Sequence, residues 1–198
     1  MEEENRAAKR DKFAQPQQGK NKQKIIVSVV VVALLGYFAW SFFGPEKDPN
    51  ATNGKGGTWS IGDKFAYGDK EVQQTPVKNL VENGRIKISK QDVLNNKIIY
   101  TEYAKGDKVV PLTAYINLKG RVIVAISMCE PCKSKRFRIA VDQLVCNTCG
   151  TRWKLTNLEG ISGAPECFKY PPDELRYEQD GDFITLDENT IANWQPRV

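Results

Sequence analysis

The segment Arg121-Val-Ile-Val-Ala-Ile-Ser-Met-Cys-Glu-Pro-Cys132 joins an apolar run to a pair of cysteines. Val122–Ser127 carries no charge, and such a continuous apolar run is typical of a central strand of a sheet. A second pair follows in Cys146-Asn-Thr-Cys149-Gly150, with 13 residues between the two pairs. The segment therefore predicts a β domain in which a central strand leads directly into the first of two metal-binding loops.

The two C-x-x-C pairs offer four thiolates of matching spacing. Two thiolates at positions i and i+3 of a tight turn can bind one metal ion from the same side, and a second such turn completes a sulfur tetrahedron. Cys129, Cys132, Cys146 and Cys149 are therefore the predicted ligands. Four thiolates can hold one iron ion, a [2Fe–2S] or [4Fe–4S] cluster, or one zinc ion. Spacing alone favours structural zinc, because zinc ribbons use the same arrangement.

The cysteine pairs are also compatible with disulfides if the domain lies in an oxidising compartment. A thioredoxin-type redox pair needs a strand–turn–helix setting, which the sequence around the pairs does not provide. The fifth cysteine, Cys167, follows the second pair with 17 residues between them. It is a further candidate metal ligand, a resolving thiol, or a small buried hydrophobic residue.

Residues around the pairs bear on the charge of the site. Gly150 lets the backbone bend so that its N–H groups face sulfur, and such contacts tune a redox potential. Four basic residues follow the first pair closely, and they either stabilise thiolates or form a solvated surface. They are Lys133, Lys135, Arg136 and Arg138.

The chain of 198 residues contains no histidine. Mixed cysteine–histidine zinc sites, histidine-ligated haem, the Rieske cluster and histidine-dependent catalytic pairs are therefore excluded. No catalytic carboxylate pair, nucleophile elbow, phosphate loop or nucleotide fingerprint is recognisable. A non-catalytic protein is therefore favoured over an enzyme.

The net charge of +5 is unevenly distributed. Residues 1–24 carry seven Lys/Arg and four Asp/Glu, whereas the part from Trp59 onward carries 20 basic and 18 acidic residues. A nearly balanced main domain argues against binding to nucleic acid.

Residues 25–43 form an uncharged run of 19 residues. A helix of this length spans about 28 Å at ~1.5 Å per residue, close to the ~30 Å hydrocarbon core of a bilayer. We therefore predict a transmembrane helix, and the excess of positive charge before it places the N-terminus in the cytoplasm. The alternative is a cleaved signal peptide, with Ala39 and Ser41 as the small residues of a cleavage site.

This anchor divides the chain into four predicted parts. Residues 1–24 are a disordered cytoplasmic tail, residues 25–43 the transmembrane helix, residues 44–58 a flexible linker, and residues 59–198 an extracytoplasmic domain.

The outer domain shows short alternating segments separated by turns, and no long helical period after residue 90. The segment 78–84 predicts a short helix or turn, and Pro111 predicts an edge position or a bulge. The stretch after Leu155 that contains Gly160, Gly163 and Pro165 predicts a loop. The sequence predicts an all-β class of antiparallel strands with the cysteine pairs at loop tips. The expected strands cover 85–89, 97–103, 109–117, 121–127, 137–140, 144–146, 151–155, 175–178 and 183–186.

Residues from Val124 to Leu186 resemble the FtrD-like family of membrane iron–sulfur proteins. The resemblance rests on the cysteine block and on several supporting pieces after it. These are Cys129-x-x-Cys132, Leu144-Val-Cys-Asn-Thr-Cys-Gly150-x-Arg152-Trp153, Ile161-Ser-Gly-Ala-Pro-Glu-Cys167, Pro171-Pro172-x-x-Leu175 and Gly181-Asp182-x-Ile184. The resemblance implies a membrane-tethered protein that binds an Fe–S cluster or a metal and acts in iron transport or extracytoplasmic electron transfer.

The same block is more distantly similar to the Rieske layout, in which two ligand-bearing loops close over a cluster in an all-β domain. Cys149 stands where a Rieske protein has a histidine, so the similarity concerns the fold and not the ligands. It implies a Rieske-like antiparallel sandwich or barrel with metal-binding loops.

Taken together, these observations predict a single-pass membrane protein whose outer domain binds an iron–sulfur cluster or iron. Its expected partner is a membrane protein, such as an iron permease or a polyferredoxin-type protein. The alternative is a structural zinc-ribbon-like module that serves a membrane complex. A thiol–disulfide oxidoreductase is the third and least favoured interpretation.

Overall fold

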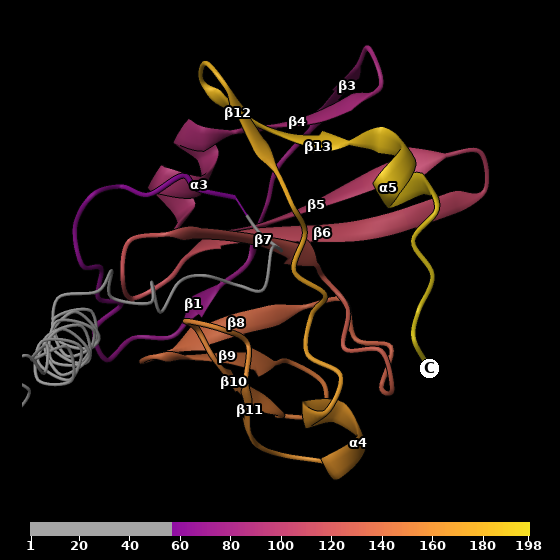
Figure 1. Cartoon of the computed structure of the whole chain (residues 1–198). Coiled ribbons are helices and arrows are strands. Elements are labelled where there is room, and N and C mark those ends of the chain that lie inside the picture. Colours follow the sequence, from indigo (N-terminus) through magenta and orange to yellow (C-terminus); the bar gives the residue numbers. More distant parts are fainter. Residues whose placement is uncertain (1–56) are drawn as a thin grey trace, which may run out of the picture. The chain divides into compact units, whose positions relative to one another are not determined.

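The computed structural model describes residues 57–198, which form three β-sheets with three short helices (Figure 1). The all-β prediction is confirmed for this part of the chain. The predicted tail and transmembrane helix, and the linker up to residue 56, lie outside the described residues. Among residues 57–198, no helix is long and apolar enough to cross a membrane.

The middle sheet has the strand order β2-β5-β6-β7. Its strands are β2 (Thr75–Pro76), β5 (Ile98–Lys105), β6 (Lys108–Ile116) and β7 (Val122–Ile126). Alternate residues of β6 and β7 face two different hydrophobic cores, one on each side of the sheet. All five residues of β7 are buried. Burial on both faces explains why this strand reads as a continuous apolar run.

The prediction that β7 is a central strand is wrong as to strand order, because β7 ends the sheet. Its outer edge is nevertheless covered by other segments of the chain. The N–H of Val122 donates to the carbonyl of Trp59, and the N–H of Leu175 donates to the carbonyl of Val124. These bonds satisfy backbone groups that an open edge would leave to solvent. Strand β7 lies in the middle one of the three sheets, with a hydrophobic core on each face. Burial on both faces gives it the continuous apolar sequence that a central strand of a sheet would have.

No bulge forms at Pro111, which pairs with Glu102 in regular register, but the predicted edge position holds on the side of β6 that faces β7. The ladder between β6 and β7 begins only at Leu112. Beyond it, the carbonyl of Pro111 accepts a hydrogen bond from the N–H of Ser127. Pro111, which has no backbone N–H, therefore stands just beyond the last β6–β7 pair, where β7 needs no hydrogen-bond donor from it.

The first outer sheet has the order β12-β13-β4-β3 and packs on one face of the middle sheet. It contains β3 (Leu80–Glu82), β4 (Arg85–Ser89), β12 (Glu178–Asp180) and β13 (Phe183–Asp187), with α3 (Lys90–Asn96) and α5 (Glu188–Ala192) beside it. The predicted helix at 78–84 is wrong: strand β3 lies there, and only the turn is confirmed. Asn83 and Gly84 have positive φ angles of 51° and 73°, which a two-residue hairpin turn requires.

The second outer sheet has the order β1-β8-β9-β10-β11 and covers the other face of the middle sheet. Its strands are β1 (Val72–Gln73), β8 (Phe137–Ala140), β9 (Gln143–Cys146), β10 (Arg152–Lys154) and β11 (Gly160–Ser162), followed by α4 (Pro165–Phe168). The hairpin predicted between the cysteine pairs is confirmed as β8–β9. The loop predicted around Gly160, Gly163 and Pro165 is wrong in part, because β11 pairs with β10 and α4 begins at Pro165.

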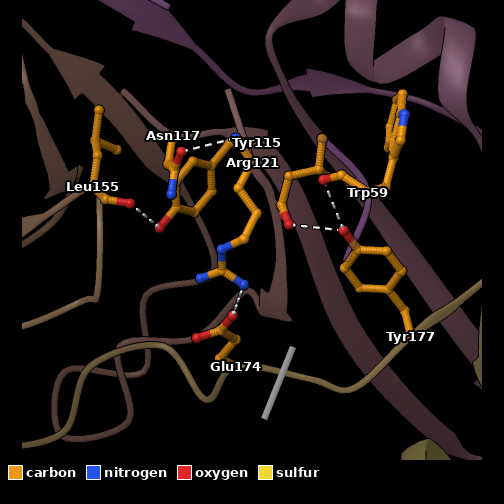
Figure 2. Close-up of polar contacts among 8 residues, drawn as sticks. Trp59, Tyr115, Asn117, Arg121, Leu155, Glu174 and Tyr177 are labelled. Atoms are coloured by element: carbon orange, nitrogen blue, oxygen red, sulfur yellow. Dashed lines mark hydrogen bonds and ion pairs between the residues drawn. The ribbon is translucent and has the colours of Figure 1, made fainter. Parts of the chain in front are cut away.

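Buried polar contacts join the layers where β7 begins (Figure 2). The Arg121 Nη1 atom lies 2.9 Å from Glu174 Oε1, and the two side chains are only 7% and 9% exposed. The hydroxyl of Tyr115 donates to the carbonyl of Leu155, which links the middle sheet to the second outer sheet. The hydroxyl of Tyr177 donates to the carbonyl of Val122 at 2.9 Å. The layers are thus tied by specific hydrogen bonds as well as by apolar packing.

Replacing Glu174 by Ala should lower the free energy of unfolding by about 3–5 kcal/mol, because it leaves the Arg121 guanidinium buried and uncompensated. Urea denaturation followed by tryptophan fluorescence measures the change. The matched control is Glu178→Ala, which removes an exposed pair with Arg85 and should cost about 0–1 kcal/mol. Equal losses in the two variants would contradict a stabilising role for the buried pair.

Candidate metal centre

The two cysteine turns share one backbone plan. The N–H of Cys129 donates to the carbonyl of Ser134 at 2.8 Å, and the N–H of Cys146 donates to the carbonyl of Thr151 at 2.9 Å. Each bond closes a loop from the first cysteine of a pair to the residue five positions later. We call these segments, residues 129–134 and 146–151, the first and second cysteine turns.

The residue after the second cysteine of each pair has a positive φ angle, 57° at Lys133 and 70° at Gly150. Glycine adopts this conformation readily, whereas lysine does so at a cost. The sequence signals the bend at Gly150 but gives no sign of the equivalent bend at Lys133. The two turns therefore match in shape although only one of them ends in glycine.

The β8–β9 hairpin brings the two turns together. Phe137 pairs with Cys146 in the ladder, and the N–H of Asn147 continues it by donating to the carbonyl of Arg136 at 3.0 Å. The 13-residue interval of the sequence is thereby folded back on itself. As a result, the second turn begins beside the segment in which the first turn ends.

This arrangement gathers the four predicted ligands. The Sγ atoms of Cys129, Cys132, Cys146 and Cys149 all lie within 4.8 Å of one another. The Cys129 and Cys149 sulfurs are 3.9 Å apart, and those of Cys132 and Cys146 are 3.7 Å apart. Each of these close contacts joins one turn to the other. Cys129 and Cys146 are fully buried, while Cys132 and Cys149 are partly exposed.

The sulfur spacing can be compared with the size of a metal site. Thiolate bonds of ~2.3 Å around one tetrahedral ion place the sulfurs about 3.8 Å apart, close to the two distances quoted above. A cluster of two or four irons distributes its thiolates over different metal atoms, which spreads the sulfurs farther apart. The donor set fits iron or zinc chemically, and its spacing fits a single ion better than a cluster.

Polar groups of both turns lie close to the sulfurs. The backbone N–H groups of Cys149 and Thr148 and the side chain of Ser134 all lower the pKa of Cys146. The Cys149 thiol donates to the hydroxyl of Thr151 at 3.1 Å. Ser134 and Thr151 occupy equivalent positions, two residues after the second cysteine of their pairs. We did not predict either hydroxyl, although the shared pattern C-x-x-C-x-[Ser/Thr] is visible in the sequence.

The thiols differ in their readiness to ionise. The pKa of Cys146 is lowered, chiefly by its interaction with the neighbouring Cys129 thiol. The pKa of Cys129 is raised by the same interaction and by burial. Burial also raises the pKa of Cys132 to about 12. The surroundings therefore favour ionisation of Cys146 over ionisation of Cys129 and Cys132.

Cys167 lies against the same group of sulfurs. Its residue is 4% exposed, it stands on α4, and its thiol interacts with those of Cys129 and Cys149 and with the hydroxyl of Thr151. Burial raises its pKa. The five cysteines therefore form one cluster, in which four sulfurs make the compact set and the fifth borders it.

The basic residues after the first pair do not form a single cationic lining. Arg138 pairs with Glu71 at 3.0 Å, and the Arg136 guanidinium stacks on the ring of Tyr100 at 3.4 Å. The side chains of Lys133 and Lys135 are exposed. Hydrogen bonds from the two cysteine turns thus act directly on the sulfurs, whereas the two arginines are held elsewhere.

A family model described as "Membrane iron-sulfur containing protein FtrD-like" matches residues 93–198, which is more than half of the chain. The chain belongs to the FtrD-like family. The matched region contains all five cysteines, so the resemblance read from the cysteine block is confirmed. The FtrD-like description associates the chain with a membrane and with iron–sulfur chemistry. No curated protein and no solved structure was found to match the chain.

Metal affinity of this FtrD-like chain should rise with pH between 6 and 8. The raised pKa values keep Cys129 and Cys132 protonated, so a metal ion must displace protons, and fewer protons compete as the pH rises. Cobalt(II) titrations followed by thiolate-to-cobalt absorption measure the effect. An affinity that is independent of pH would contradict binding through these thiols.

The variant Cys167→Ser should still bind one metal ion per chain, because the other four sulfurs complete a tetrahedron. The variant Cys146→Ser should not bind metal stably, because it lacks one of the four sulfurs. Metal analysis of the two variants after dialysis makes the comparison. Equal loss of metal in both would show instead that Cys167 is a ligand.

Proposed function

We propose that this FtrD-like protein is a membrane-anchored redox protein in which Cys129, Cys132, Cys146 and Cys149 bind iron. In this proposal the iron centre accepts and donates single electrons on the extracytoplasmic side. Residues 25–43 anchor the chain, residues 1–24 lie in the cytoplasm, residues 44–58 are the linker, and residues 59–198 form the outer domain.

The compact set of four sulfurs is the observation that carries the proposal. Its spacing favours one iron ion in tetrahedral thiolate coordination. Backbone N–H and hydroxyl groups aimed at sulfur stabilise thiolate charge and thereby set the potential of an iron centre. Cys132 and Cys149 form a partly exposed side, which would give an electron a short path to a partner.

The expected partner is a membrane protein that exchanges electrons or iron, such as an iron permease or a polyferredoxin-type protein. Electron transfer and iron delivery use the same centre, and the protein itself need not be catalytic. The nearly balanced charge from Trp59 onward argues against a nucleic-acid partner. The three sheets, with both cysteine turns on adjacent loops, support the proposal of a Rieske-like layout.

The test is to purify the full-length chain anaerobically in detergent and to measure iron, zinc and acid-labile sulfide. We expect iron without sulfide, together with a coloured oxidised form that dithionite bleaches and air restores. Iron with sulfide would support the redox role but contradict a single ion. A colourless protein that carries zinc would contradict the redox proposal.

The second candidate is a structural zinc module that presents a surface to a membrane complex. The same observation favours it, because the tetrahedral spacing suits zinc as well as iron. Under this alternative, metal removal unfolds the second outer sheet, and reductants or oxidants change nothing in the metal-loaded protein. Tryptophan fluorescence of the metal-loaded chain across a redox titration separates the two candidates.

A further inference from the structure

The first cysteine turn contains a buried acidic residue. Glu130 stands directly after Cys129, and its side chain is only 1% exposed. A carboxylate is costly to bury unless it is paired. When the neighbouring cysteines bind a metal as thiolates, their negative charge adds to this cost. The turn therefore needs a cation close to Glu130.

Arg197 supplies that cation. Its Nε atom donates to Glu130 Oε1 at 2.7 Å, its Nη2 atom lies 2.5 Å from the same oxygen, and its backbone N–H donates to Oε2. The Nη2 atom also donates to the carbonyl of Pro171, and the guanidinium lies 5.7 Å from the centre of the Tyr170 ring. One arginine thus holds the first cysteine turn and the segment that follows Cys167.

The path of the chain explains how Arg197 reaches this place. After α5, the Nζ atom of Lys108 donates to the carbonyls of Ala192 and Trp194 at 2.6 and 2.7 Å. After these hydrogen bonds, the chain runs beside the loop between β7 and β8 (Figure 1). Glu130 and Arg197 are 67 positions apart, and no sequence pattern links them.

We propose that Arg197 is a positioning residue of the metal centre, which keeps the first cysteine turn closed by pairing with Glu130. Without the guanidinium, the Glu130 carboxylate would be drawn toward water, and the flanking ligands Cys129 and Cys132 would move with it. The inference rests on the proposed metal centre but not on the identity of the metal.

The test uses cobalt(II) as the probe metal in the full-length chain, because its thiolate absorption reports coordination whether the native metal is iron or zinc. In Arg197→Gln, the release of cobalt to excess chelator should be about tenfold faster or more, a change of the size that loss of outer-shell support for a metal site usually produces. Arg197→Lys should release cobalt more slowly than Arg197→Gln but faster than the native chain, because lysine keeps the positive charge without the bidentate geometry of the guanidinium. Arg176→Gln is the matched control, since Arg176 is exposed and forms no ion pair within residues 57–198.

A double-mutant cycle separates pairing with Glu130 from a general effect on stability. In a Glu130→Gln background, Arg197→Gln should change the release rate much less than it does in the native background. An equal effect in both backgrounds, or release at the native rate from Arg197→Gln, would overturn the inference. Iron analysis of the native protein tests the redox proposal separately, so failure of one does not imply failure of the other.

Discussion

The register of the β8–β9 ladder is the constraint on which the candidate metal centre depends. Because Phe137 pairs with Cys146, the end of the first cysteine turn and the start of the second lie on neighbouring strands. A slip of one residue would turn Cys146 to the opposite face of the sheet. Inward-facing Phe137 and Trp153 resist such a slip, since both are fully buried and pack edge to face at 5.9 Å. Apolar packing thus fixes the position of the sulfurs.

The layering of the domain connects this site to the rest of the chain. The middle sheet buries both faces, and its last strand, β7, leads directly into the first cysteine turn. Gln74 adds a buried polar link: its amide donates to the hydroxyls of Thr113 and Ser127 and accepts from the N–H of Phe137. The first turn is therefore held by the middle sheet and by Arg197, and the second turn by the β8–β9–β10 ladder.

The sequence was sufficient to predict the four sulfurs, the β class and most strands, because period-2 patterns and C-x-x-C spacing are local signals. The turn at Lys133 escaped prediction, since lysine does not mark a positive φ angle. The sequence predicts a helix or turn where strand β3 forms, because the three residues of β3 are exposed and show no alternation between a buried and an exposed face. The pairing of Glu130 with Arg197 depends on tertiary folding and leaves no local trace.

X-ray absorption at the iron edge of the anaerobically purified protein tests the central claim most directly. If the two cysteine turns enclose one ion, the spectrum should show four sulfur neighbours at about 2.3 Å and no iron neighbour. A short iron–iron distance would contradict a single-ion centre. Oxygen or nitrogen atoms in place of sulfur would contradict the assignment of Cys129, Cys132, Cys146 and Cys149 as the ligands.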